Sequence, residues 1–272
     1  MSNFSTLLYA AEQGIAHITL NRPERLNALG KQSLVEINMA LDLAESDDSV
    51  RAIVVSGAGK AFSSGFDLKE QMEARPEGDA IWREILARDF DTTMRFWDSP
   101  KPTIAAVHGA CLAGAFEIAL ACDITVAAES AIFGEPELKF GAGIVTMLLP
   151  WLTGPKQAKE IILTGLDRID AHSARELGVV NRVVPEGEHV AEAMRIARTM
   201  AVIDPNLVRV TKSAINHSFE ARGMKAALQH ALDLDHAVES KGSPDKQAFM
   251  AVARERGMRE AIQWRDRRFS ER

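Results

Sequence analysis

The chain has 272 residues, of which 46% are hydrophobic and 26% charged, and its formal net charge is −6. These values are those of a globular protein that builds its own core, and they exclude a disordered, collagen-like or disulfide-stapled chain. An acidic chain creates no field that attracts nucleic acid or an anionic membrane surface, so we expect neither as a partner.

The compartment is predicted from the cysteines and the apolar segments. Cys111 and Cys122 lack the spacing of a metal or redox motif, and they are interpreted as reduced thiols. The first nine residues carry neither the basic start nor the long apolar run of a signal peptide. The most apolar stretch, 103–128, is interrupted by one histidine and two acidic residues, which a membrane span rarely carries together. We therefore expect a cytoplasmic protein that does not span a membrane.

The first half of the chain alternates between strand and helix patterns. Short apolar or β-branched runs predict strands at 15–20, 50–56, 103–107, 124–128 and 131–133. Helical spacing predicts helices at 29–45 and 114–121, and a charged, mainly helical segment at 71–98 with a break at 76–78. Strands that alternate with helices predict an α/β fold in which helices cover the sheet.

From residue 155 onward the pattern is helical. We expect helices at 156–163, 171–177, 190–201, 205–216, 226–239 and 245–257. The composition changes near residue 200, without a linker or an internal repeat. We therefore divide the chain into a core, 1–200, and a C-terminal α-helical region, 201–272, that packs on its own core or on another subunit.

The first chemical candidate is the turn that leads from a strand into the helix at 114–121. Its small residues, 109–114, let a ligand approach the backbone, and the free N–H groups at a helix start suit a phosphate or a developing oxyanion. Close packing of strand on helix would explain the same residues.

Glu117 has apolar neighbours on this helix, and burial without a cation would raise the pKa of its carboxyl towards the range useful for proton transfer. The alternative is a glutamate that reaches solvent or caps a polar group.

A second carboxylate is available in the segment Gly134-Glu135-Pro136-Glu137. Charged loop residues are usually solvated, but a carboxylate that faced Glu117 would complete an acid–base pair. The segment 57–68 has neither the spacing of a phosphate loop nor a nucleophile elbow, so we expect turn and cap roles for Ser63 and Ser64. Histidines and cysteines form no cluster with metal-ligand spacing, and no metal site is expected.

Seven short motifs occur in one order along residues 10–270. They lie at 21–29, 61–68, 101–109, 113–117, 121–124, 133–137 and 163–165. Each is weak alone, but their order and spacing make the chain resemble the enoyl-CoA hydratase/isomerase family, also called the crotonase family. The resemblance implies an α/β fold, a crotonase-like spiral of ββα units with a C-terminal α-helical trimerisation region, and trimers that often stack into hexamers.

The same resemblance assigns roles to residues of this sequence. The backbone N–H groups of Phe66 and Gly114 would form the oxyanion hole, and Glu117 and Glu137 would be the catalytic pair, with Glu135 a bystander. Coenzyme A would lie along Arg25, Leu26, Ser64, Asp67 and Leu68. The implied partners are an acyl-CoA substrate and further copies of the chain, as a homotrimer or homohexamer. No cofactor is expected, because coenzyme A is part of the substrate.

The implied activity is that of a hydro-lyase, which adds water across the 2,3 double bond of a 2-enoyl-CoA thioester. One carboxylate takes a proton from water as the oxygen attacks Cβ, and the other carboxyl group delivers a proton to Cα. A Δ3,Δ2-enoyl-CoA isomerase, which needs one base, and a thioester hydrolase are alternatives. A non-catalytic CoA-ester or RNA binder is a further alternative, against which the net charge and the two glutamates argue. Residues 141–151, about two residues shorter than the usual family stretch, are expected to line the acyl end, so the acyl group stays open.

Overall fold

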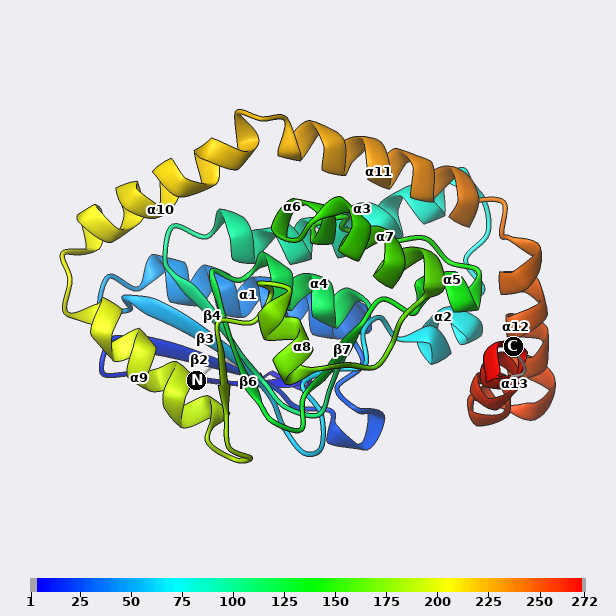
Figure 1. Cartoon of the computed structure of the whole chain (residues 1–272), viewed down its shortest axis with the longest axis horizontal. Helices are drawn as coiled ribbons and strands as arrows, with labels where there is room; N and C mark the ends of the chain where they lie inside the picture. Colours follow the sequence, from blue (N-terminus) through cyan, green and yellow to red (C-terminus); the bar gives the residue numbers. More distant parts are fainter. Residues whose placement is uncertain (1–3, 271–272) are drawn as a thin grey trace.

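The larger of two sheets forms the centre of the molecule (Figure 1). The computed structural model describes residues 4–270; residues 1–3, the start of the segment expected to lack a signal peptide, lie outside this range, as do 271–272. The larger sheet has the strand order β1 (Leu7–Glu12), β2 (Ile15–Leu20), β3 (Ala52–Gly57), β4 (Thr103–Val107), β6 (Ile124–Ala128), β9 (Arg182–Val184). Strands β1 and β2 pair antiparallel, and the other neighbours are parallel. The smaller sheet consists of β5 (Ala110–Leu112), β7 (Ile132–Gly134) and β8 (Ile169–Asp170).

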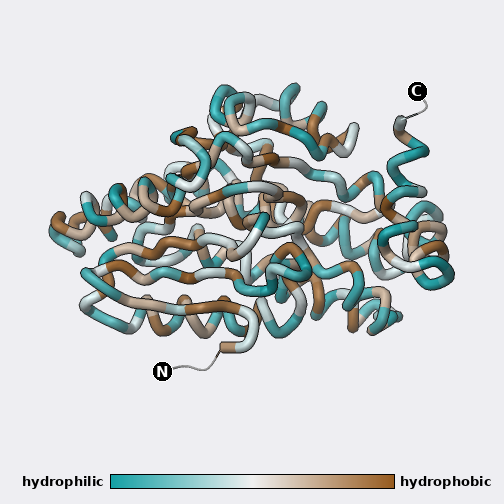
Figure 2. The backbone as a smooth tube through the Cα atoms, turned by 90° about the horizontal axis from the view of Figure 1, so that it is seen from below, coloured by the Kyte–Doolittle hydropathy of each residue, from teal (hydrophilic) through white to brown (hydrophobic). Residues whose placement is uncertain are grey.

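The central strands are continuous apolar runs because helices cover both faces of the larger sheet. Alternate residues of a strand point to opposite faces. Ile53 and Val55 of β3 belong to the core under α1 (Lys31–Ser46) and α4 (Gly114–Ala121). Ala52 and Val54 belong to a second core with α9 (His189–Ala201). In Figure 2 hydrophobic residues accordingly run along the strands in the middle of the molecule.

The predicted strands and helices are present, with ends shifted by a few residues. The remaining predicted helices are α2 (Leu68–Ala74), α3 (Asp79–Asp98), α7 (Pro155–Thr164), α8 (Ala171–Glu176), α10 (Pro205–Glu220), α11 (Met224–Glu239) and α12 (Pro244–Arg256). The helices that the sequence pattern did not predict are η1 (Pro23–Arg25), α5 (Glu137–Phe140), α6 (Leu149–Leu152) and α13 (Met258–Ser270). The short ones show no periodicity, and α13 is too polar to display an apolar stripe, with only Ala261 and Arg265 buried.

The C-terminal helices leave the core and return to it. Helices α10 and α11 run along one side of the molecule, and α12 and α13 pack together near α5 and α2 (Figure 1). Helix α11 lies against α3, so residues of the C-terminal region reach the interior. The division of the chain at residue 200 stays a prediction. Among the described helices, none combines the length and the hydropathy that crossing a bilayer requires.

One buried carboxylate holds the two residues that precede the edge strand β1. Glu36 of α1 accepts hydrogen bonds from the backbone N–H groups and hydroxyls of Ser5 and Thr6, at 2.7–3.0 Å. Burial alone would raise the pKa of Glu36, but these bonds and one from Gln32 outweigh it and lower the pKa to about 2.

Replacing this carboxylate should loosen the N-terminal strand. Because hydrogen bonds to charged groups are strong, Glu36→Gln should lower the free energy of unfolding by about 1–3 kcal/mol at pH 7. A lowered pKa stabilises the fold above about pH 4.5, and this contribution is lost as the pH falls towards 2, so the two proteins should converge there. Urea unfolding at both pH values tests this, with exposed Glu12→Gln as control. Equal stability at pH 7 would refute the assignment.

Candidate active site

Three glutamates meet in the interior. Glu117 lies in the first turn of α4, and Glu135 and Glu137 lie between β7 and α5. One carboxylate oxygen from each lies within 4.8 Å of the others, and the three residues are 0%, 1% and 9% exposed, respectively. The structure therefore brings together Glu117 and Glu137, the pair expected to perform acid–base chemistry.

Glu135, which the resemblance makes a bystander, also lies in this group. The backbone N–H of Glu135 donates to the Leu166 carbonyl at 2.9 Å, which holds the loop against the chain after α7. With the loop held there, the Glu135 side chain lies in the interior, inside the carboxyl cluster. From the sequence alone such a loop residue is expected to be solvated, because the contact with Leu166 is not visible there.

The cluster has no cation to balance it. Among residues 4–270, no lysine or arginine forms an ion pair with the three glutamates, and neither Glu117 carboxylate oxygen has a hydrogen-bond partner. Burial raises the pKa of Glu117 to about 7, and the nearby Thr146 N–H and hydroxyl, which lie outside hydrogen-bonding geometry, lower it only in part. Burial and the charge of Glu117 raise the pKa of Glu137 to about 8. Burial, followed by the charges of Glu137 and Glu117, holds the pKa of Glu135 well above its usual value.

These pKa values decide what the cluster can do. Close carboxyls titrate together, so near neutral pH they share protons and present a carboxylic acid beside a carboxylate. An acid and a base in one site are the two forms that proton transfer to and from a substrate requires. Carboxylate oxygens at this spacing could also ligate a hard cation such as Mg²⁺, but only once all were ionised, and burial opposes that state.

Two free backbone amides lie beside this cluster. The backbone at Gly65 has φ +88°, and a Cβ there would lie 2.7 Å from the Leu112 carbonyl oxygen and 3.3 Å from the Gly114 nitrogen. The loop of Gly65 and Phe66 thus lies against the start of α4. Within the described chain, neither the Phe66 nor the Gly114 backbone N–H donates a hydrogen bond. These two amides are the ones that the resemblance assigns to an oxyanion hole.

Gly114 also serves packing, as the alternative interpretation of the small residues stated. A Cβ at Gly114 would lie 2.3 Å from Cε2 of the Phe66 ring, so the ring occupies the space that the glycine leaves. Close packing and free N–H groups are therefore two consequences of the same turn. The neighbouring Ala113, at the N-cap of α4, has φ +55°, a backbone conformation that is unfavourable for alanine.

The residues expected along coenzyme A gather on one loop surface. The Ser64 N–H donates to the Leu26 carbonyl at 2.9 Å, and Arg25 pairs with Asp67 at 2.8 Å. Asp67 also caps α2, which begins at Leu68. The Asp67 carboxylate is occupied by these contacts and by Arg22, so it shapes the loop and leaves ligand contacts to the backbone.

The predicted turn role of Ser63 is confirmed. The residue is fully buried, its hydroxyl donates to the Asn27 carbonyl at 2.8 Å, and it accepts from the Gly65 N–H at 3.1 Å. These contacts hold the loop before Phe66 in the shape that presents its amide.

Two further acidic residues near the cluster, Asp89 and Asp235, were not predicted from the sequence. Asp89 of α3 affects the pKa of Glu117, as does Thr146, and Asp235 of α11 affects that of Glu137. Asp235 and Asp89 stand on helices far from Glu117 in the sequence, so only tertiary packing reveals their place. Residues 144–146, in the stretch expected to line the acyl end, are buried, and Val145 and Thr146 adjoin Glu117.

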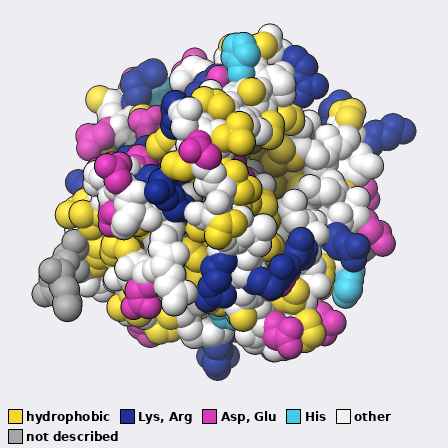
Figure 3. All heavy atoms as spheres, turned by 90° about the vertical axis from the view of Figure 1, so that its left-hand side faces the viewer, with side chains coloured by type: hydrophobic (Ala, Val, Ile, Leu, Met, Phe, Trp, Pro, Cys, Tyr) yellow, Lys and Arg dark blue, Asp and Glu magenta, His cyan; other side chains and the backbone are white. Residues whose placement is uncertain are grey.

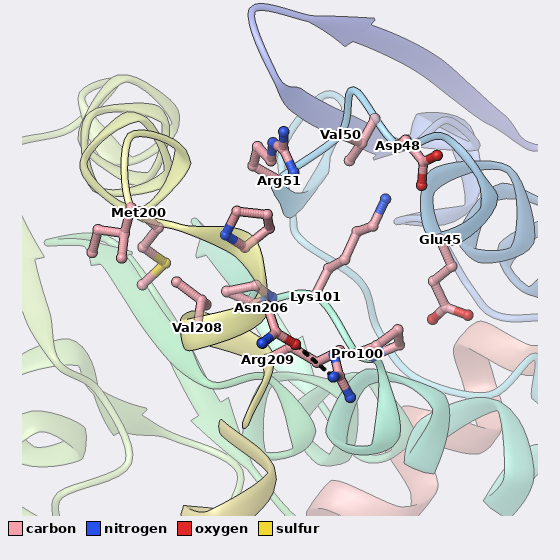
Figure 4. Close-up of a pocket in the computed structure, with 13 residues that line it drawn as sticks. Glu45, Asp48, Val50, Arg51, Pro100, Lys101, Met200, Asn206, Val208 and Arg209 are labelled. Carbon is pink, nitrogen blue, oxygen red and sulfur yellow. Dashed lines mark hydrogen bonds between the residues drawn. The ribbon is translucent and has the colours of Figure 1, made fainter. Parts of the chain in front are cut away.

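A separate cavity of about 300 Å³ opens near α10, at the amino ends of β3 and β4. Figure 3 faces this side of the molecule and shows hydrophobic side chains around a hollow. The charged residues that line the cavity are Arg51, Lys101, Arg209, Glu45 and Asp48. In Figure 4 the Arg209 guanidinium donates a hydrogen bond to the side-chain oxygen of Asn206 (2.7 Å). Ligands of α/β sheets bind beyond the carboxyl ends of the strands, and no member of the carboxyl cluster lines this cavity. The carboxyl cluster is therefore the candidate active site.

Known proteins resemble this chain over most of its length. The sequence model of the enoyl-CoA hydratase/isomerase family matches residues 10–255. A probable enoyl-CoA hydratase of Mycobacterium tuberculosis is 36% identical over 80% of this chain and 84% of its own length. A probable mitochondrial enoyl-CoA hydratase of Dictyostelium discoideum is 40% identical over 75% of this chain and 72% of its own. The crystal structure of an enoyl-CoA hydratase/isomerase from Xanthobacter autotrophicus Py2 has 62% sequence identity and a TM-score of 0.97, covering 98% of this chain and 99% of that one.

The unbalanced cluster should lower stability as the pH rises. A carboxyl whose pKa is raised from 4.5 to about 7 stabilises the fold fully below pH 4.5, and this contribution is lost as the pH rises through 7. Glutamine at position 117 carries no charge at any pH. The difference in unfolding free energy between Glu117→Gln and the wild type should therefore shift by about 1–3 kcal/mol in favour of the variant when the pH is raised from 4 to 8.

Chemical unfolding of both proteins at the two pH values measures this difference. Exposed Glu129→Gln serves as the matched control and should show no such gain. A constant or decreasing difference for Glu117→Gln would show that the buried carboxyl is balanced by a partner.

Proposed function

Because the chain belongs to the enoyl-CoA hydratase/isomerase family and has its α/β fold, we propose that it hydrates 2-enoyl-CoA thioesters. The observation that carries this proposal is the pair of buried carboxyls, Glu117 and Glu137, in one cluster beside two free backbone amides. A Δ3,Δ2 isomerase needs one base, whereas a site with two proton-sharing carboxyls serves a reaction that moves two protons.

The thioester carbonyl would accept hydrogen bonds from the N–H groups of Phe66 and Gly114. Negative charge develops on this oxygen when water attacks Cβ, and preorganised donors stabilise it without reorganisation. One such donor is worth about 10²–10³-fold in rate. Gly114 is the first residue of α4, where the positive end of the helix dipole adds to the effect.

The proton steps balance within the carboxyl pair. The ionised carboxyl takes a proton from water as the O–Cβ bond forms, and the protonated carboxyl gives its proton to Cα as the enolate collapses. The pair begins and ends with one proton, which has changed places. Glu135 supports this arrangement: burial and the charges of Glu137 and Glu117 raise the pKa of its carboxyl, and its hydrogen bond to Glu137 lowers the pKa of Glu137.

Coenzyme A would lie along the loop surface of Arg25, Leu26, Ser64, Asp67 and Leu68. Because the Asp67 side chain is engaged within the loop, the contacts to coenzyme A would come mainly from backbone groups and the Arg25 side chain. The proposed reaction uses no metal and no cofactor, since coenzyme A is part of the substrate.

Removing either carboxyl should stop hydration. With a panel of trans-2-enoyl-CoA esters, the wild type should give products heavier by one water. Glu117→Gln and Glu137→Gln should each lose about 10²–10⁴-fold in kcat, because each removes one acid–base group. Exposed Glu129→Gln is the control and should keep full activity.

The product distinguishes the alternatives in the same assay. A product of unchanged mass would establish an isomerase, and release of free thiol would establish a hydrolase. Binding of the esters without any turnover would establish a non-catalytic CoA-ester binder and overturn the hydratase proposal.

The rate should depend on pH as the shared proton requires. Since the raised pKa values of Glu117 and Glu137 are about 7 and about 8, kcat/KM should be bell-shaped with its maximum between these values. Below the maximum the pair holds two protons and lacks a base, and above it the pair lacks an acid. A rate that stays constant from pH 5 to pH 9 would exclude acid–base catalysis by this pair.

We propose that the chain assembles as a homotrimer, or as a dimer of trimers, through α10. This helix buries none of its residues in the single chain. Leu207 and Val210 lie on one stripe at its start, and Ile203 lies two residues before the helix; they are 56%, 43% and 44% exposed, respectively. An apolar stripe of this kind marks a surface for a protein partner, and further copies of the chain fit it.

The assembly can be tested by light scattering coupled to size exclusion. The wild type should have three or six times the chain mass of 29.8 kDa. Leu207→Asp places a charge in the stripe and should give a smaller species with native circular dichroism, whereas Lys241→Asp, outside the stripe, should not. A wild type that is monomeric at micromolar concentration would refute the proposal.

A further inference from the structure

One buried carboxyl near the candidate active site has no side-chain partner among residues 4–270. Asp235 of α11 is 6% exposed, and in the described structure neither of its carboxylate oxygens has a hydrogen-bond partner. A buried polar group without a partner is costly, and native proteins rarely keep one without a function. The unpaired carboxyl of Asp235 therefore indicates a ligand group that pairs with it.

Lys246 is the cation whose charge acts on Asp235, but its ammonium group already pairs with another carboxylate. The Lys246 ammonium forms an ion pair with Glu239 and lies 4.2 Å from the ring centre of Trp82. Burial, followed by the charges of Glu239 and Glu117, raises the pKa of Asp235 to about 7, and the Lys246 charge and the nearby Gly143 backbone N–H offset this only in part. Near neutral pH this carboxyl is thus a mixture of acid and carboxylate.

Asp235 lies against the 141–151 stretch, which is expected to line the acyl end of the site. A Cβ at Gly143 would lie 2.0 Å from Asp235 Oδ1, so the glycine of the 141–151 stretch leaves the room that the carboxyl occupies. The charge of Asp235 raises the pKa of Glu137, and that of Glu117 raises the pKa of Asp235, so this carboxyl is electrostatically coupled to the catalytic pair.

A buried apolar cluster lies one turn away from Asp235 along α11. Leu232, one turn before Asp235 on α11, belongs to a buried cluster with Trp82, Leu86 and Val145. Phe66, whose N–H is proposed to bind the thioester oxygen, packs against the same cluster. The acyl chain of a thioester bound at Phe66 would thus run along apolar side chains towards Asp235.

The chemistry of the site selects the kind of group that Asp235 would meet. A plain hydrocarbon chain would leave the carboxyl buried and unpaired. An anionic acyl group would face the carboxyls of Asp235, Glu117, Glu137 and Asp89, which repel it. A hydroxyl both donates and accepts, so it can pair with the ionised and with the protonated form of Asp235.

We propose that Asp235 is a specificity-determining residue that binds a hydroxyl on the acyl group, so that the preferred substrates are hydroxylated enoyl-CoA esters. This rests on the proposed function, since it takes the acyl chain of a CoA thioester to run from Phe66 along the Val145 cluster.

Matched pairs of esters test the proposal. Each pair consists of a trans-2-enoyl-CoA ester of six or eight carbons and the same ester with a terminal hydroxyl. In the wild type, kcat/KM should favour the hydroxylated member of at least one pair by about tenfold or more, because a site built to hydrogen-bond a group rejects the analogue that lacks it. Asp235→Leu should abolish this preference, and Asp235→Asn, which keeps a donor and an acceptor, should retain part of it.

A binding measurement separates this proposal from the hydratase proposal. Saturated esters, such as hexanoyl-CoA and 6-hydroxyhexanoyl-CoA, cannot react by hydration, and calorimetry gives their affinities for the wild type and for exposed Asp233→Asn as control. No turnover with tighter binding of the hydroxylated esters would sink the hydratase proposal and support the role of Asp235. Turnover without a hydroxyl preference, in rate and in binding and at both chain lengths, would overturn the role of Asp235 and leave the hydratase proposal intact. Because the wild-type ratios decide this outcome, it stands even where Asp235→Leu fails to fold.

Discussion

The site depends on burying carboxyl groups without a cation. In a medium of low dielectric constant, neighbouring negative charges repel strongly, so buried carboxyls respond by keeping protons. Glu117, Glu135 and Glu137 are held in this state by their burial and by one another. The same constraint that costs stability near neutral pH supplies an acid and a base side by side, which links the energetics of the fold to the proposed chemistry.

The fold fixes these groups by packing rather than by salt bridges. Helix α4 carries the Gly114 amide at its start and Glu117 one turn later, and all of its residues are buried. The Phe66 ring fills the space at Gly114, so the two amides proposed as the oxyanion hole are spaced by a packing contact. The loop of Glu135 and Glu137 follows β7 and is held by the backbone hydrogen bond to Leu166, in the segment that leads into the neighbouring strand β8.

Most of this framework could be predicted from the sequence, and the exceptions have physical reasons. The strands of the central sheet are apolar runs, and the apolar neighbours of Glu117 predicted its burial. The meeting of Glu137 with Glu117 was expected only from the resemblance that the seven motifs carry. No local pattern in the sequence shows that the start of α5 meets α4. The inward position of Glu135 depends on one backbone contact, and that of Asp235 on how α11 packs over α3. Strands of two or three residues, such as β8 and β9, are too short for any periodicity.

The central claim is that carboxyl groups in the interior keep their protons near neutral pH. The most direct test is a pH titration of the unliganded protein, with ¹³C-labelled glutamate side-chain carboxyls followed by nuclear magnetic resonance or infrared difference spectroscopy. The account predicts signals of protonated glutamate carboxyls that persist above pH 6 and titrate as a coupled group around pH 7 to 8, with one signal missing in Glu117→Gln. A titration in which every glutamate is ionised by pH 5.5 would contradict it, because the site would then hold only carboxylates and no acid.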